Sequence, residues 1–302
     1  MRRAPFRSRL AAILATLAVT TLSAADSPLF KASFLTTGEF TGGIEGPACD
    51  RAGNLYCVSF REARNIGRVT PDGRSELFVA LPEKSAGNGI RFNAQGIMFV
   101  ADYTGHNVLR VDPDTRAVSV LVHNPAMNQP NDLAIAKDGT LYASDPNWGN
   151  GTGQVWRITP DGKSHLEAKD MGTTNGIEVS PDGRHVYVNE SVQRNIWVFD
   201  RASDGSLSNK RLLRKFDDFG FDGMRSDIDG NLYVTRHGKG TVVKLSPKGE
   251  VLREIDVLGP NPSNICFGGP DGCTAYVTEA KSMRVVQFRV DRPGLEWSRW
   301  KR

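Results

Sequence analysis

The chain has 302 residues, of which 24% are charged and 39% hydrophobic, and its formal net charge is +4. Its first 25 residues contain four arginines and no acidic residue, so the remainder is formally neutral. This balance argues against nucleic acid or an anionic membrane surface as a partner, and the length allows one large all-β domain or two ordinary domains.

Residues 1–25 predict a secretory signal peptide. The four arginines precede an apolar run over residues 10–22, and small residues at 23–25 offer a cleavage site. The run is short for a membrane span, although an uncleaved N-terminal anchor is the alternative. We therefore expect one domain over residues 26–302, exported to the periplasm or secreted, monomeric and free of the membrane after cleavage.

From residue 45 onward the chain repeats one pattern six times. A polar residue and usually a glycine precede a short apolar strand, then come a turn and a second apolar strand; the clearest copy spans residues 175–188. The polar residue that leads each copy is Glu45, Asn88, Asn131, Asn175, Asp222 and Ser263, at spacings of 43, 43, 44, 47 and 41 residues. Such a period, with several strands per unit, indicates a β-propeller. We predict an all-β, six-bladed propeller with four antiparallel strands per blade.

Each repeat continues into further strands. Third strands are predicted around residues 66–69, 155–158 and 242–245, and fourth strands around 77–79, 118–122 and 251–255. Aromatic residues on the second and third strands are interpreted as packing between blades. A propeller must close the gap between its first and last blades, and we expect residues 29–34 or 295–297 to add an outer strand there. No window shows sustained helical periodicity.

The four cysteines show no C-x-x-C spacing, which argues against a zinc site built on them. Cys49 and Cys57 flank one predicted hairpin, and Cys266 and Cys273 flank another. In an exported protein this arrangement suggests two local disulfides, with buried free thiols as the alternative.

The leading residues carry the candidate chemistry. The first strand of each blade lines the channel of a propeller, so the leading residues should converge at one end of it. Two carboxylates among three carboxamides favour a hard cation such as Ca²⁺, and the lack of Cys or His there argues against a soft metal. The alternative is that Asn-Gly and Asp-Gly are only turn chemistry, but Glu45 precedes Gly-Pro and does not fit it.

These motifs resemble the gluconolactonase/regucalcin (senescence marker protein) family over essentially the whole chain after residue 25. The matching segments are 45–47, 130–132, 174–183, 221–224 and 267–271. The resemblance implies a six-bladed propeller with one divalent cation, usually Ca²⁺, with Mg²⁺, Mn²⁺ or Zn²⁺ as alternatives. It assigns Glu45, Asn175 and Asp222 as metal ligands and Asn131 as a fourth ligand or a substrate contact. It also makes Asp222 the catalytic acid/base, with Asn88 and Gln129 as further substrate contacts.

The function that this resemblance implies is hydrolysis of a small-molecule lactone, of sugar origin. The cation would polarise the carbonyl, and Asp222 would move the proton. Many sugar lactonases of the family carry an arginine where this chain has Gln129, so the resemblance does not assign gluconolactone itself as the substrate. A non-catalytic propeller that binds a carbohydrate or protein is the alternative, and esterase or phosphotriesterase activity is a third. Arg236 and His237 are expected to form an exposed loop pair, with a position facing the mouth as the alternative. Trp148 is expected to be exposed, in an insertion that rims a pocket or is a plain loop.

Overall fold

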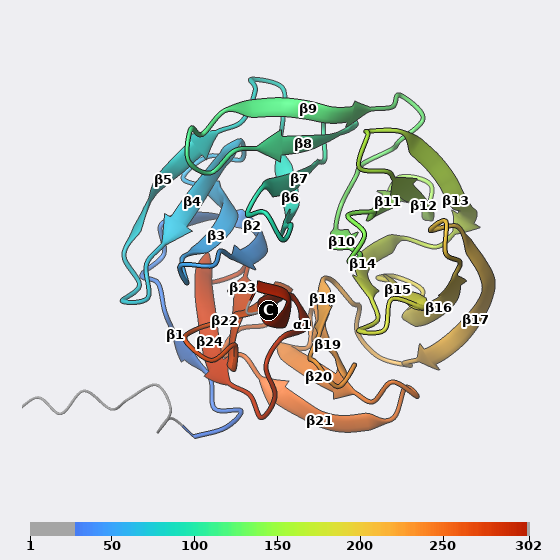
Figure 1. Cartoon of the computed structure of the whole chain (residues 1–302). Helices are drawn as coiled ribbons and strands as arrows, with labels where there is room; N and C mark the ends of the chain where they lie inside the picture. Colours follow the sequence, from blue (N-terminus) through green and yellow to red (C-terminus); the bar gives the residue numbers. More distant parts are fainter. Residues whose placement is uncertain (1–27, 301–302) are drawn as a thin grey trace, which may run out of the picture.

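The computed structural model describes residues 28–300, and these fold into six four-stranded antiparallel sheets arranged around a channel (Figure 1). The first three blades, from inner to outer strand, are β2 (Phe40–Cys49), β3 (Leu55–Phe60), β4 (Asn65–Val69) and β5 (Ser75–Ala80); β6 (Gly87–Phe92), β7 (Met98–Asp102), β8 (Asn107–Val111) and β9 (Val118–His123); and β10 (Leu133–Ile135), β11 (Leu141–Asn147), β12 (Thr152–Ile158) and β13 (Ser164–Met171).

The fourth and fifth blades follow the same order. They are β14 (Thr174–Val179), β15 (His185–Glu190), β16 (Asn195–Arg201) and β17 (Leu207–Lys215), then β18 (Met224–Ser226), β19 (Leu232–Arg236), β20 (Thr241–Leu245) and β21 (Val251–Asp256). The prediction of an all-β, six-bladed propeller with four antiparallel strands per blade is confirmed.

The sixth blade combines both ends of the described chain. Its strands β22 (Pro262–Gly268), β23 (Thr274–Glu279) and β24 (Arg284–Arg289) are completed by β1 (Ser33–Phe34), which pairs antiparallel with β24. Ser33 faces Gln287 and Phe34 faces Val286 in this register. Of the two segments expected to close the ring, residues 29–34 therefore provide the outer strand.

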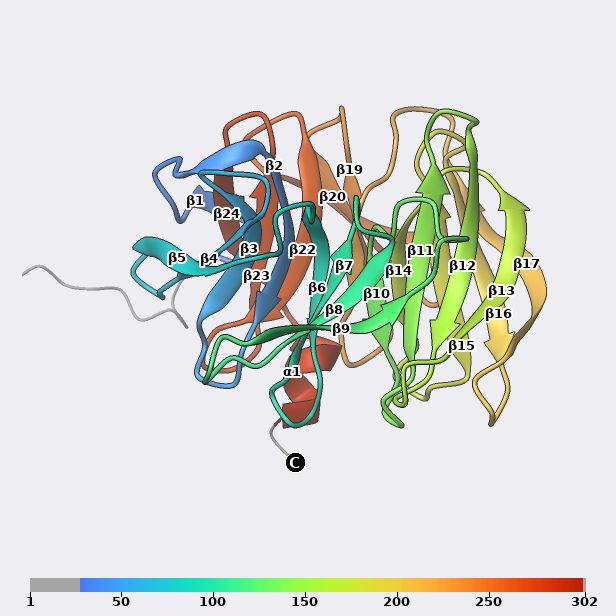
Figure 2. The same ribbon diagram turned by 90° about the horizontal axis from the view of Figure 1, so that it is seen from above.

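The second candidate segment is helical instead. Helix α1 (Leu295–Trp300) lies at one end of the channel, where Figure 1 shows it at the centre of the ring and Figure 2 shows it beyond the strand ends. Six residues are fewer than two turns, too few for a periodic pattern in the sequence. The Phe92 amide donates to Glu296 Oε1 (3.2 Å), and Arg299 donates to the Ile135 carbonyl (2.6 Å), so α1 is tied to the second and third blades.

The core lies between the blades rather than at the axis. Second strands such as β3 are buried along their whole length, because a neighbouring blade covers each face, whereas outer strands such as β21 are largely exposed. Tyr56 shows the packing: its ring meets those of Phe78 (4.9 Å between centroids) and Phe92 (5.4 Å) edge-on. The predicted role of the aromatic residues is confirmed at this position.

The predicted signal peptide and the predicted disulfides have different outcomes. The predicted signal peptide, residues 1–25, lies outside the described residues and stays a prediction. The four cysteines are free thiols, three of them buried, so the two local disulfides are not formed in the structure. Among residues 28–300, no helix is both long and apolar enough to cross a membrane.

Candidate active site

Hydrogen bonds at or beside the leading residues join at least four of the six pairs of neighbouring blades. The amide after the leading residue donates to the leading carbonyl of the next blade: Gly89 to Asn131 at 2.7 Å, Gly176 to Asp222 at 3.1 Å and Gly223 to Ser263 at 2.7 Å. The Ser263 hydroxyl then donates to the Ile44 carbonyl (2.7 Å), which links the last blade to the first. We call this arrangement the mouth ring.

Glycine follows the leading residue in four blades because adjacent blades leave no space for a side chain. A Cβ atom on Gly46 would lie 2.0 Å from the Asn88 carbonyl oxygen, and one on Gly223 would lie 1.9 Å from the Asn264 carboxamide carbon. Gly46 also has a φ of 56°, which favours glycine. The glycines therefore allow close approach between blades, and Asn175-Gly176 lies inside β14 rather than in a turn.

The mouth ring brings two carboxyl groups close together. Glu45, from the first blade, and Asp222, from the fifth, lie within hydrogen-bonding reach of each other. Burial raises the pKa of Glu45 to about 7, opposed by the Gly46 amide (2.5 Å) and the Asn264 carboxamide (2.9 Å), which both donate to Oε2. Burial and the neighbouring Glu45 raise the pKa of Asp222 well above its usual value. Either a proton or a cation must relieve this crowding.

Three oxygen atoms of the leading residues lack a hydrogen-bond donor among the described residues. They are Glu45 Oε1, Asn131 Oδ1 and Asn175 Oδ1, and all three are buried. A buried acceptor without a partner costs about 1–3 kcal/mol, so such a set is unfavourable unless something else binds it. Carboxylate and carboxamide oxygens are the ligands that Ca²⁺ prefers. Together with Asp222, these residues fit a hard divalent cation.

The candidate metal site depends on carboxamides as much as on acids. Among the residues that the structure describes, no three His, Cys, Asp or Glu side chains form a cluster that could hold a metal. The Asn175 carboxamide is oriented by its own NH₂ group, which donates to Ser191 Oγ at 3.0 Å and leaves Oδ1 free to bind. The donor set consists of oxygen alone, which agrees with the hard-cation preference predicted from the sequence.

The predicted substrate contacts lie beside the ring. Asn88 is half-buried, and its NH₂ group donates to the Asn131 carbonyl (3.1 Å). Gln129 is also half-buried, and its backbone N–H donates to Asp145 Oδ1 (2.6 Å). Trp156 Nε1 donates to the other oxygen of Asp145 (2.9 Å), which fixes this carboxylate on β11. Asp145 therefore holds the backbone of the loop that presents Gln129, while the substrate role of Gln129 stays a prediction.

One expectation about this end of the molecule is wrong. Arg236 was expected in an exposed loop pair, but its side chain is 1% exposed, whereas His237 is exposed. The Arg236 guanidinium donates to the carbonyl (2.6 Å) and to Oδ1 (2.7 Å) of Asp218, and it lies 4.2 Å from the centre of the Phe216 ring. Arg236 ends β19 and thereby fixes the loop that leads to Asp222. Trp148 is exposed as expected, within hydrogen-bonding reach of Tyr103.

The sequence reasoning missed a layer of buried charges below the mouth ring. Arg225 from the fifth blade donates to both oxygens of Asp132 from the third (2.8 and 3.2 Å). Arg91 from the second blade lies 3.6 Å from Glu178 of the fourth. Three of these side chains stand three positions after a leading residue, so alignment of the six repeats by position could have revealed them. Each pair joins two blades that are not neighbours in the ring.

Comparison with known proteins places the chain in a family. A family model described as the SMP-30/Gluconolactonase/LRE-like region matches residues 31–281. The chain belongs to this family. The gluconolactonase of Zymomonas mobilis is 32% identical over 282 residues, covering 81% of this chain and 78% of that protein. The 6-deoxy-6-sulfogluconolactonase of Pseudomonas putida is 28% identical over 248 residues, covering 79% and 83%.

A solved structure agrees with this membership. A gluconolactonase from Xanthomonas campestris aligns with a TM-score of 0.74 and 25% identity, and the alignment covers 89% of this chain and 93% of that one. The family predicted from the sequence motifs is therefore confirmed. The SMP-30/gluconolactonase fold brings Glu45, Asn175 and Asp222 together from three blades.

Proposed function

We propose that this protein hydrolyses lactones, of sugar origin, with a hard divalent cation held in the mouth ring. The observation that carries the proposal is that the Glu45 and Asp222 carboxyl groups lie within hydrogen-bonding reach, while three buried oxygens of Glu45, Asn131 and Asn175 have no donor among the described residues. The names of the relatives, gluconolactonase and 6-deoxy-6-sulfogluconolactonase, support lactones as the substrate class.

Glu45, Asn131, Asn175 and Asp222 would hold the cation, and Ca²⁺ best fits their oxygen donors. When bound, this cation supplies positive charge that stabilises the negative charge developing on the ester carbonyl oxygen. Asn264 and the Gly46 amide hold Glu45 Oε2 and so fix the direction in which Oε1 points. The site is thus oriented before substrate arrives.

Asp222 is the candidate proton-transfer group because it combines partial exposure with a carboxyl group in the ring. It would take a proton from the attacking water as the new C–O bond forms. It would then return that proton to the ring oxygen as the ester bond breaks, which leaves the open hydroxy acid. Without a cation, burial and the negative charge of Glu45 raise the pKa of Asp222; a bound cation would oppose this shift and keep Asp222 ionised, as a base must be.

The mouth also offers candidate contacts for substrate hydroxyl groups. Asn88, Gln129 and Asn131 carry carboxamides that can donate and accept hydrogen bonds. Their neutral character favours a polyhydroxylated, uncharged ring over a phosphorylated one. We further propose that the protein acts after export, because residues 1–25 have the pattern of a signal peptide.

A panel of aldonolactones, assayed by acid release with Ca²⁺ and then with a chelator, tests the proposal. Wild-type turnover should be lost on chelation and return with the cation. The variant Asp222→Asn should lose about 10²–10⁴-fold in turnover. Asp217→Asn, an exposed acid five positions upstream, is the matched control and should keep wild-type activity. Full turnover in Asp222→Asn would refute the proton-transfer role, and lactone binding without acid release by the wild type would support a non-catalytic propeller.

A further inference from the structure

Two buried thiols face each other across the seam between the first and last blades. Cys49 ends β2 and Cys266 lies in β22, 217 positions away, yet their sulfur atoms are 3.9 Å apart. Their side chains are 2% and 1% exposed. The two strands belong to different sheets, so a bond between these sulfurs would add a covalent link between the first and last blades, in addition to the backbone of residues 35–39 that joins β1 to β2.

We propose that Cys49 and Cys266 are the site of an inter-blade disulfide, formed when the protein meets a small-molecule or protein disulfide. A disulfide has a sulfur–sulfur distance of about 2.0 Å, so the two sulfurs must approach by roughly 2 Å. Because the thiols are already in contact, side-chain rotation and a small shift of the seam can bring this about. The proposal does not depend on the lactonase function.

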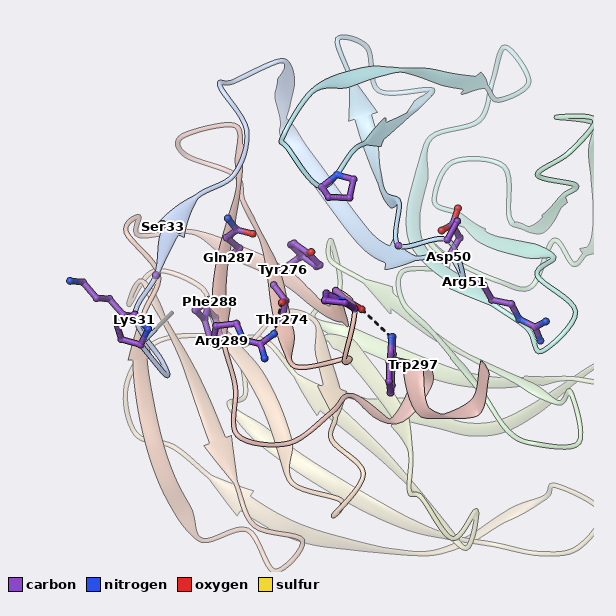
Figure 3. Close-up of a pocket in the computed structure, with 18 residues that line it drawn as sticks. Lys31, Ser33, Asp50, Arg51, Thr274, Tyr276, Gln287, Phe288, Arg289 and Trp297 are labelled. Atoms are coloured by element: carbon purple, nitrogen blue, oxygen red, sulfur yellow. Dashed lines mark hydrogen bonds between the residues drawn. The ribbon is translucent and has the colours of Figure 1, made fainter. Parts of the chain in front are cut away.

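A cavity at the seam approaches this pair, although neither sulfur lines it. It has a volume of about 690 Å³ and lies between the first blade, β1 and the last blade (Figure 3). Its lining includes Asp50, Gly268 and Tyr276, which are neighbours of the thiols in sequence or space. A Cβ atom on Gly268 would lie only 2.5 Å from Cys49 Sγ, so Gly268, which lines the cavity, packs directly against that sulfur. Trp297 forms another part of the wall, where its Nε1 donates to the Gly269 carbonyl (3.1 Å).

The chemistry is an ordinary thiol–disulfide exchange. The first thiolate attacks the oxidant, a mixed disulfide forms, and one thiolate of the oxidant leaves. The second cysteine attacks the protein sulfur of that mixed disulfide and releases the other half of the oxidant. Two protein thiols are thereby oxidised, one disulfide is reduced to two thiols, and these take up the two protons. The neighbouring Cys266 and burial raise the pKa of Cys49 well above its usual value, so exchange should be slow at neutral pH and faster in alkali.

Thiol counting and peptide mapping test the proposal on the full chain. After incubation with oxidised glutathione, the denatured protein should show two alkylatable thiols instead of four, and digestion should give a peptide pair joining Cys49 to Cys266. The variants Cys57→Ala and Cys273→Ala should still lose two thiols. Cys49→Ala should lose none and, if it does not fold, Cys266→Ala replaces it. The oxidised wild type should melt on the order of 5 °C or more above the reduced protein, because the bond closes a very long loop.

Several results would overturn the proposal. One is a link that joins Cys57 or Cys273 to another cysteine in place of the predicted pair. Another is retention of all four thiols in the folded wild type under conditions in which the unfolded chain is oxidised. A melting shift of the same size in Cys49→Ala would also overturn it, because that variant cannot form the bond.

Discussion

The buried ion pair between Asp132 and Arg225 provides a direct test of what holds the third and fifth blades together. The Asp132 side chain is 0% exposed and that of Arg225 is 3% exposed, and the guanidinium contacts both carboxylate oxygens at 2.8 and 3.2 Å. The variant Asp132→Asn keeps the shape and one acceptor but removes the charge, which leaves Arg225 buried without its counter-ion. Loss of one partner of a buried pair costs about 3–5 kcal/mol of unfolding free energy.

Urea unfolding, followed by circular dichroism, measures this cost. Asp200 and Arg211 form the matched control, since they pair at the same 2.7–2.8 Å range but are 39% and 48% exposed. Asp200→Asn should therefore cost less than about 1 kcal/mol. The double variant Asp132→Asn with Arg225→Gln should recover part of the loss, because neither charge is then left unpaired. If Asp132→Asn is no more destabilising than Asp200→Asn, the pair does not hold the third and fifth blades together.

Two further predictions concern the mouth ring. Gly223→Ala should destabilise the protein by about 1–3 kcal/mol, because its Cβ would lie 1.9 Å from Asn264. Gly42→Ala is the control: a Cβ there would have its nearest atom at 3.8 Å, so the change should be nearly neutral. Equal urea midpoints for the two variants would contradict this. Saturation with Ca²⁺ at about 100 times its dissociation constant should stabilise the wild type by about 2.7 kcal/mol, so a chelator should lower its melting temperature. Glu45→Gln should show a smaller calcium-dependent shift, and an unchanged shift would place the cation elsewhere.

The repeat period was sufficient to predict the blade number and the ring of leading residues, because each blade must place the same position at the channel. The roles of Arg236 and α1 could not be predicted in this way. Arg236 is the last residue of its strand, where exposure is usual, and only the structure shows that Asp218 and Phe216 enclose it. The proximity of Cys49 to Cys266 was missed because hairpin neighbours were the nearest candidates in sequence.

The candidate metal site and the seam of the propeller are physically linked. Glu45 stands on the first blade, yet Asn264 of the last blade holds its Oε2, and the Ser263 hydroxyl binds the carbonyl of Ile44 next to it. Any opening of the seam would therefore release Glu45 from the other proposed ligands, which stand on the third, fourth and fifth blades. The β1–β24 pairing, and a bond between Cys49 and Cys266 if it forms, act on this same boundary. Closure of the ring should thus set the affinity of the cation site as well as the stability of the fold.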